Sequence, residues 1–164
     1  MKSWEEVVPD IDRKIYQKGG FGQKQEVGEK AALLIIDVVE SFVGSREMDV
    51  LDAIEEYSTS CGENGWKALP YIKQILDFCR EKGIEVIYTK GDPLYKSLCG
   101  DSVKHGTPEE IYRLHSTPIA SAISPLEDEF VLQKTKASAF FGTPLATYLN
   151  RKRVDTLFVV GTST

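Results

Sequence analysis

Four short apolar runs recur along the chain, separated by segments with helical periodicity. Each run is rich in Val, Ile, Leu and Phe and is too short to be a buried helix; they are residues 31–37 (AALLIID), 84–90 (IEVIYTK), 129–134 (EFVLQK) and 155–161 (DTLFVVG). Runs of this length and composition predict strands that are covered on both faces. Strands that alternate with helices indicate a parallel sheet with right-handed crossovers. The sequence therefore predicts a three-layer α/β/α fold.

Helix patterns with recognisable ends lie between these runs. In residues 65–83 the apolar positions follow helical spacing, with Pro70 suited to a first turn and Gly83 to a left-handed C-terminal end. Thr107 and Glu110 have the spacing of a capping box at the start of a later helix. These ends predict helices that pack on the sheet as separate crossovers.

Composition and charge exclude several classes of protein. The formal net charge is -5 and the lysines are scattered among acidic residues, so no basic stripe exists for a nucleic-acid backbone. The N-terminus lacks the pattern of a secretory signal, and no apolar stretch approaches the roughly 18 residues of a membrane span. We therefore expect a cytoplasmic protein without a nucleic-acid or membrane partner.

The cysteines give no sign of a disulfide framework or a zinc site. Cys61, Cys79 and Cys99 are odd in number and form no CxxC pair, which favours reduced thiols. Cys79 falls on an apolar helix face, and the other two lie in polar segments without an adjacent histidine. None of the three is expected to be a catalytic nucleophile.

Polar groups follow three of the predicted strands where each strand ends. Asp37 ends the first run, Lys134 ends the third, and the fourth continues into residues 161–164 (GTST). Ligands of open parallel sheets bind beyond the carboxyl ends of the strands. Asp37 and Lys134 are therefore expected side by side at one edge, either as a structural ion pair or as part of an active site.

The segments around these residues resemble a known family of enzymes. Residues 32–43 (ALLIIDVVESFV) and 134–164 (KTKASAFFGTPLATYLNRKRVDTLFVVGTST) look like motifs of the isochorismatase-like cysteine hydrolases. The segments KGGFGQ, SCGENGW and SAFFGT are most similar to the branch of N-carbamoylsarcosine amidohydrolase and maleamate amidohydrolase. The resemblance covers the chain from about residue 20 to Thr164.

This resemblance implies a Rossmann-like fold and an Asp-Lys-Cys triad. It assigns the aspartate to Asp37 and the lysine to Lys134, and it places the cysteine just beyond Thr164. Residues 1–164 are accordingly expected to be a single isochorismatase-like hydrolase domain that is C-terminally incomplete and inactive alone. The resemblance also implies a non-proline cis peptide at Thr162 and Ser163, in a turn whose backbone donors would bind an oxyanion.

The function implied is an amidohydrolase that releases ammonia from a small carbamoyl or amide acid through a thioester. The alternatives are a vinyl ether hydrolase that lacks the cysteine and a noncatalytic scaffold with the same fold. The expected partners are a small amide or ureido substrate and further copies of the chain in a homo-oligomer, possibly with a second chain carrying the rest of the domain. The group that binds the substrate carboxylate is expected from beyond Thr164 or from a neighbouring subunit.

Other residues are candidates for the substrate pocket. Phe42 and Phe140 are expected to form pocket walls and Ser138 to orient the substrate, although local packing and local backbone bonding explain them as well. Residues 40–66 are expected to form a helix and a loop over the site, and residues 91–106 a second surface loop.

No metal or other cofactor is expected. Asp92, His105 and His115 match no spacing of metal ligands, and a solvated loop is the simpler interpretation of their segment.

Overall fold

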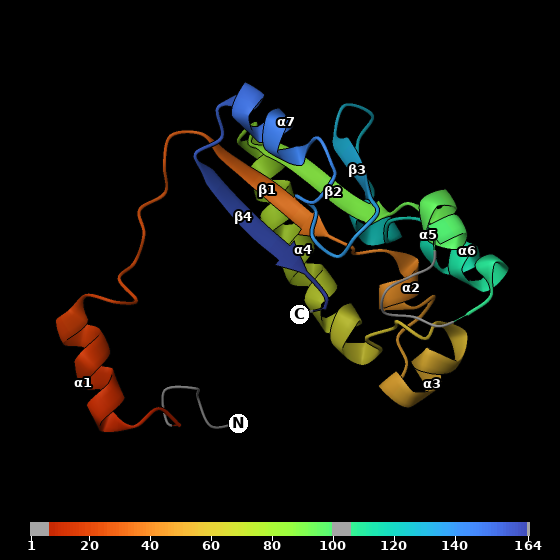
Figure 1. Cartoon of the computed structure of the whole chain (residues 1–164), viewed down its shortest axis with the longest axis horizontal. Helices are drawn as coiled ribbons and strands as arrows, with labels where there is room; N and C mark the ends of the chain where they lie inside the picture. The colour runs from red at the N-terminus through yellow and green to blue at the C-terminus, as the bar shows by residue number, and fades with distance from the viewer. Residues whose placement is uncertain (1–6, 100–105, 164) are drawn as a thin grey trace.

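The computed structural model describes residues 7–99 and 106–163 and contains one parallel sheet (Figure 1). Its strands are β1 (Ala31–Ile36), β2 (Glu85–Gly91), β3 (Phe130–Lys134) and β4 (Thr156–Gly161). Each predicted apolar run is a strand, so the sheet predicted from the sequence is confirmed. The strand order is β3-β2-β1-β4, and all three pairings are parallel.

Helices occupy most of the connections between these strands. Before β1 lies α1 (Asp10–Gly19), and between β1 and β2 lie α2 (Glu40–Val43), α3 (Val50–Glu56) and α4 (Glu63–Glu81). Between β2 and β3 lie α5 (Pro93–Cys99), α6 (Pro108–Ser116) and the 3-10 turn η2 (Ser121–Ile123). The last crossover is α7 (Leu145–Lys152). The connection from β2 to β3 therefore contains α5 within the segment that was predicted to be a loop.

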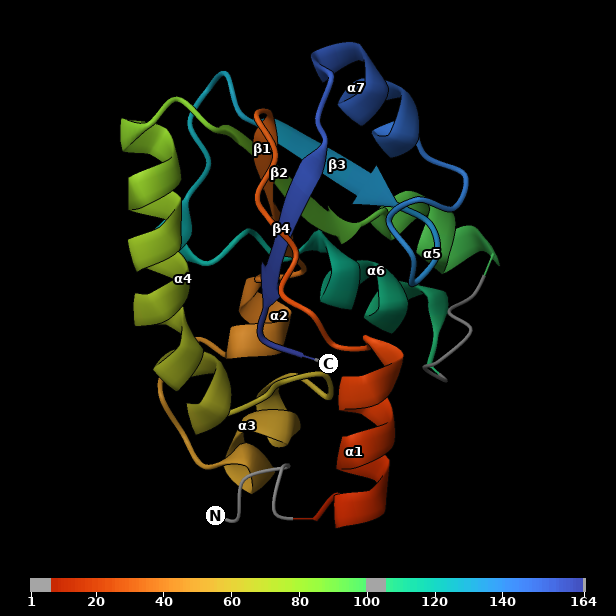
Figure 2. The same ribbon diagram turned by 90° about the vertical axis from the view of Figure 1, so that its left-hand side faces the viewer.

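The two faces of the sheet are covered by different helices (Figure 2). Leu33 and Ile35 of β1 belong to an apolar cluster with α4, whereas Ala32 and Leu34 belong to a cluster with Leu145 of α7. Side chains of a strand alternate between its two faces, so this division is the period-2 pattern of a strand buried on both sides. The three-layer α/β/α arrangement is confirmed.

The ends of the helices follow the sequence in part. The capping box of α6 forms as predicted, with Thr107 and Glu110 each accepting the other's backbone N–H. The helix containing Pro70 begins earlier than predicted, because α4 starts at Glu63 and Pro70 lies in its interior. Its start follows Gly62, which has a positive φ of 54° and approaches the backbone of Val50 so closely that a Cβ would lie 2.6 Å from Val50 Cα. The close approach of the Gly62 and Val50 backbones therefore fixes where α4 begins.

The N-terminal helix lies apart from the sheet in both ribbon views (Figures 1 and 2). No residue of α1 is buried. The segment after α1 is joined to the rest of the fold just before β1, where the carboxylate of Asp155 accepts the N–H groups of Glu29 and Lys30. No helix within the described residues is long and apolar enough to span a membrane.

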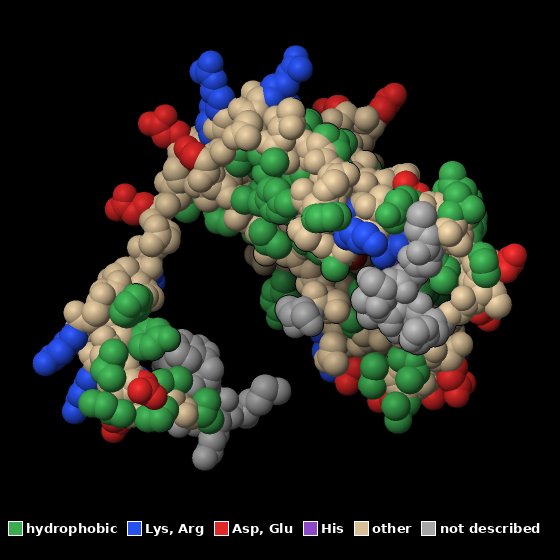
Figure 3. Space-filling view, in the orientation of Figure 1, with side chains coloured by type: hydrophobic (Ala, Val, Ile, Leu, Met, Phe, Trp, Pro, Cys, Tyr) green, Lys and Arg blue, Asp and Glu red, His purple; other side chains and the backbone are tan. Residues whose placement is uncertain are grey.

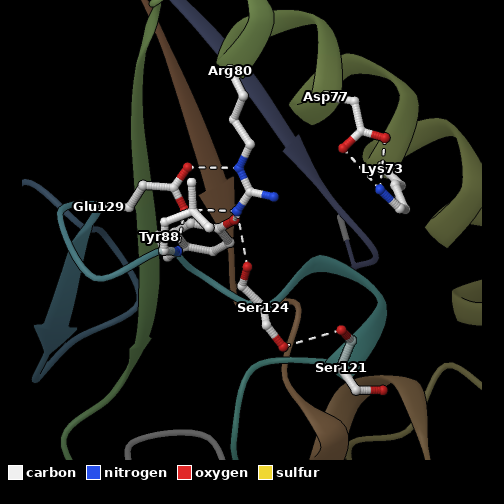
Figure 4. A network of polar contacts seen from close by, with 8 residues as sticks. Lys73, Asp77, Arg80, Tyr88, Ser121, Ser124 and Glu129 are labelled. Atoms are coloured by element: carbon white, nitrogen blue, oxygen red, sulfur yellow. Dashed lines mark hydrogen bonds and ion pairs between the residues drawn. The ribbon is translucent and has the colours of Figure 1, made fainter.

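A network of polar contacts joins α4 to β2 and to the segment that precedes β3 (Figure 4). The guanidinium of Arg80 makes a two-pronged contact with the carboxylate of Glu129, with both N–O distances 2.8 Å. It also donates to the hydroxyl of Tyr88 on β2 at 3.2 Å and to the carbonyl of Ser124 at 2.9 Å. One side chain thus connects α4, β2 and the segment that leads into β3.

Replacing Arg80 with Met is expected to destabilise the fold strongly, because it leaves the Glu129 carboxylate, 9% exposed, without its partner. Breaking a buried ion pair from one side costs about 3 to 5 kcal/mol, and we expect about 3 kcal/mol because Arg80 is partly exposed. The matched control is Lys73→Met, since the Lys73–Asp77 pair of the same helix is half exposed. That control is expected to cost less than about 0.5 kcal/mol. Urea unfolding measures both, and equal losses would contradict the assignment.

Glu129 should also make stability depend on pH. Burial alone raises the pKa of this carboxyl, but hydrogen bonds from Arg80 and from the Leu126 N–H, with the charge of Arg80, bring it below its ordinary value. A carboxyl with a lower pKa in the folded chain stabilises the fold above its unfolded-state pKa of about 4.3, and that contribution is lost as pH falls through the folded-state pKa. The free energy of unfolding should therefore fall more steeply below about pH 5 in the wild type than in Glu129→Gln. Parallel curves from urea titrations at a series of pH values would count against this role.

Candidate functional site

The carboxyl ends of the strands bring Asp37 and Lys134 together. Asp37 follows β1 directly, Lys134 ends β3, and β2 lies between these strands in the sheet. The ammonium of Lys134 lies 2.7 Å from Oδ2 of Asp37. Neighbouring strands are about 4.8 Å apart, so β1 and β3 are separated by about 10 Å. The pair therefore depends on the length of the lysine side chain, which reaches across the end of β2.

Thr89 of β2 fixes the aspartate of this pair. Its hydroxyl donates to Oδ1 of Asp37 at 2.8 Å and accepts the backbone N–H of Asp37 at 3.2 Å. Thr89 is almost completely buried. Since one carboxylate oxygen is held by Thr89, the other is directed at Lys134. Thr89 was not predicted from the sequence. The feature that could have indicated it is a hydroxyl residue near the end of an apolar run.

The backbone and the β3–α7 loop fix the pair further. Asp37 has a φ of 51°, in the left-handed region, and such a conformation in a residue other than glycine typically costs about 1 to 3 kcal/mol. Lys134 is 7% exposed, and its ammonium also donates to the carbonyls of Lys136 and Ala137 at 3.4 and 3.2 Å. All three of its N–H donors thus have acceptors. Both charged groups are preorganised.

A cavity of about 380 Å³ opens beside this pair. Hydroxyl groups dominate one part of its lining, and these belong to Ser41, Ser58, Thr59, Ser60 and Ser163. Phe42 forms an apolar part of the lining, as expected from the sequence. The expected covering of the site by residues 40–66 agrees with this arrangement, because α2 and the segment before α4 both contribute to the cavity. Its volume suits a small ligand.

Two predicted pocket residues do not line this cavity. The hydroxyl of Ser138 accepts the N–H of Phe140 at 3.3 Å, and the ring of Phe140 is 51% exposed. The placement of both residues in the pocket is wrong for this structure. The reason lies in the β3–α7 loop, which folds back so that its carbonyl groups accept hydrogen bonds from the ammonium of Lys134. As a result, Ala137 faces the cavity and Phe140 does not.

The turn after β4 reaches the cavity through Ser163, whereas Thr162 is absent from its lining. The peptide bonds between described residues, 161–163 included, are trans. The expected cis peptide is therefore not found at Thr162 and Ser163. A non-proline cis bond costs about 3 kcal/mol and persists only where its surroundings enforce it, and Ser163 is exposed.

The cysteines whose side chains are described, Cys61 and Cys79, are absent from the lining of the cavity. Cys79 is buried in the apolar cluster against α4. Burial raises the pKa of the Cys61 thiol, and the nearby hydroxyl of Thr162 only partly offsets this, so Cys61 is not primed to be a thiolate. The side chain of Cys99 lies outside the described residues.

The residues considered for a metal are divided between different roles. Asp92 accepts the N–H of Tyr95 at 2.9 Å and so caps the start of α5, while His115 lines the cavity. His105 lies outside the described residues. Among the residues that the structure describes, no group of three or more His, Cys, Asp or Glu side chains could hold a metal ion.

Comparison with known proteins gives the family. The model of the isochorismatase domain matches residues 31–164. The chain belongs to the isochorismatase family. This confirms the family inferred from the segments around Asp37 and Lys134, and the parallel sheet agrees with the family's solved structures. The isochorismatase family protein of Desulfovibrio vulgaris has a TM-score of 0.62 and 26% identity, over 82% of this chain and 68% of that one.

Curated relatives of this isochorismatase-family chain include two amidohydrolases. The N-carbamoylsarcosine amidase of an Arthrobacter species is 27% identical over 90% of the chain, and the maleamate amidohydrolase of Pseudomonas putida is 30% identical over 90% of it. A third, from Arabidopsis thaliana, is described as a probable inactive nicotinamidase and is 26% identical over 81% of the chain and 66% of its own length. The chain spans 54% of the length of the first relative and 66% of the second.

The role of Thr89 can be tested with two substitutions. Thr89→Val keeps the side-chain shape but leaves the N–H and Oδ1 of Asp37 without this partner, which is expected to cost about 1 to 3 kcal/mol. Thr89→Ser keeps the hydroxyl and is expected to preserve the slow hydrogen exchange of the Asp37 amide, which Thr89→Val should accelerate. Amide exchange followed by NMR, alongside urea unfolding, measures both effects. Equal exchange in the two variants would show that the hydroxyl does not hold Asp37.

Proposed function

We propose that this protein is an amidohydrolase that cleaves a C–N bond of a small carbamoyl or amide acid and releases ammonia. The observation that carries the proposal is the contact of 2.7 Å between Lys134 and Asp37 beside a cavity of about 380 Å³. Two relatives named as amidohydrolases support the same reaction class. A structural ion pair needs neither the cavity nor the left-handed backbone at Asp37, so these features favour a role in catalysis.

The third member of the triad would be a cysteine that follows Thr164. We propose that residues 31–164 belong to one hydrolase domain whose chain continues past the turn after β4. Ser163 lines the cavity, so a residue shortly after this turn would lie near the ion pair. Such a thiol would need a proton acceptor and a nearby cation to attack as a thiolate.

The ion pair would supply both functions. Asp37 would take the proton of the thiol, and Lys134 would then pair with the thiolate in place of the carboxylate. At about 4 Å and an effective dielectric of about 20, an ammonium favours an anion by roughly 4 kcal/mol, close to three pKa units before desolvation losses. Proton transfer would therefore exchange one ion pair for another instead of leaving an unpaired ammonium.

The reaction would then proceed through a thioester. The thiolate would attack the amide carbon, and the tetrahedral intermediate would collapse with cleavage of the C–N bond. Asp37 would return the proton to the departing nitrogen, which leaves as ammonia. In the second half, Asp37 would take a proton from water, and the resulting hydroxide would attack the thioester carbon. The C–S bond would break, the product would leave as an acid, and the proton on Asp37 would return to the thiolate to restore the thiol and the carboxylate.

The proposal predicts that Asp37→Asn and Lys134→Met each reduce ammonia release by at least about 100-fold. A positioned acid or base such as Asp37 contributes about 10² to 10⁴ in rate, and loss of the Lys134 ammonium removes an attraction for the thiolate worth roughly three pKa units. The measurement is release of ammonia from maleamate and from N-carbamoyl amino acids by the complete polypeptide, with folding checked by circular dichroism. The control is Lys67→Met, whose exposed pair with Glu63 lies on α4, and it should keep wild-type activity.

Two outcomes would contradict this function. A complete polypeptide that is inert on every amide, and in which both substitutions lower only stability, would be a scaffold with the family's fold. Cleavage of a vinyl ether without release of ammonia from any amide would place the protein with the ether hydrolases.

A further inference from the structure

The N-terminal helix α1 presents an apolar stripe to solvent. Ile11 and Ile15 lie one helical turn apart and are 63% and 54% exposed, and no residue of α1 is buried. Lys14 and Lys18 border this stripe, because residues three and four apart are neighbours on a helix surface. Isolated helices shorter than about 12 residues are marginal in water, and α1 has 10 residues. Packing of the stripe against a partner surface would therefore stabilise this helix.

Helix α3 presents a stripe of the same width with carboxylates at its border. Val50, Leu51 and Ile54 are 39%, 69% and 42% exposed and share one side of the helix. Glu55 lies one turn after Leu51, and Asp52 lies three residues before Glu55. The apolar stripe of α3 thus has acidic groups beside it, where that of α1 has lysines.

The surroundings of the two stripes have opposite charge. An open hollow beside α3 is lined by four acidic residues and one arginine, which are Glu47, Asp52, Glu55, Glu56 and Arg46. On α1, Asp10 pairs with Arg13 at 3.7 Å, and Lys14 and Lys18 are both exposed. Figure 3 shows acidic side chains at the margin of the apolar group over α3, whereas basic side chains project from α1. Charge and apolar surface are therefore complementary between the two helices.

We propose that α1 docks on α3 of a second copy of this chain, with α1 of that copy docked on α3 of the first. Figure 1 shows α1 beyond β4 and α3 on the opposite side of the molecule, beyond α2. The segment that leads from α1 to β1 is tied to the body where Asp155 accepts the N–H groups of Glu29 and Lys30. A two-fold axis would make the contact twice, since the same surfaces meet in both directions.

Helix α3 is a firm surface for such a contact. Its Ala53 is completely buried, and the carboxylate of Asp49 caps its start by accepting the N–H of Leu51 at 2.9 Å. The C-terminal end of α1 is also fixed, because Gly20 has a left-handed conformation and the ring of Phe21 packs on that of Tyr16 with 5.6 Å between centroids. Docking would therefore join two elements that are already folded, which limits its entropic cost.

This contact does not involve the Asp37–Lys134 pair or the cavity, so it is independent of the proposed reaction. The sequence predicted a homo-oligomer without indicating a surface for it. The inference assigns that surface to the stripes and charges of α1 and α3.

The test reverses the charges on each helix of the complete polypeptide separately. Lys14→Glu/Lys18→Glu and Asp52→Lys/Glu55→Lys should each weaken self-association by at least about 10-fold, because like charges then face each other in both contacts. An equimolar mixture of the two variants should associate within about 3-fold of the wild type, because every contact in the mixed pair again joins opposite charges. Sedimentation equilibrium measures the dissociation constants, and circular dichroism should show unchanged helix content.

Two controls make the same changes of net charge elsewhere on the surface. Lys82→Glu/Arg151→Glu and Glu127→Lys/Asp128→Lys alter exposed side chains outside α1 and α3 and should change the dissociation constant by less than about 2-fold. The inference is wrong if the wild type stays monomeric, which would leave α1 to pack on another part of its own chain. It is also wrong if the α1 and α3 variants associate as the controls do, or if mixing them does not restore association.

Discussion

The ion pair between Asp37 and Lys134 depends on how three parallel strands end. Asp37 follows β1 and Lys134 ends β3, with β2 between them. The lysine reaches the aspartate across the end of β2, where Gly91 pairs with Lys134 in the register of the sheet. Thr89 then holds the carboxylate in place. The chemistry proposed for this edge thus follows from side chains on three strands that are far apart in the sequence.

Two ion pairs in this chain show how a structural pair differs from a candidate site. The carboxylate of Glu129 accepts both prongs of Arg80 and the N–H of Leu126, so its oxygens are occupied by groups of the protein. Asp37 has its Oδ1 on Thr89 and its Oδ2 on Lys134, but it also lines a cavity and has a left-handed backbone. A cavity beside a preorganised pair is the arrangement in which a proton can be exchanged with a ligand. This difference favours catalysis over the structural interpretation that the sequence left open.

The sequence predicted the fold and the two ends of the pair, since apolar runs, capping residues and strand ends are local features. It could not predict Thr89 as the partner of Asp37, because the order β3-β2-β1-β4 is a property of the assembled sheet. Phe140 and Ser138 were misplaced because the conformation of their loop depends on contacts between its carbonyls and the ammonium of Lys134. Helix α5 was missed because residues 93–99 carry no strong helical pattern, and the bonds through Asp92 to the end of β3 form only in the folded chain.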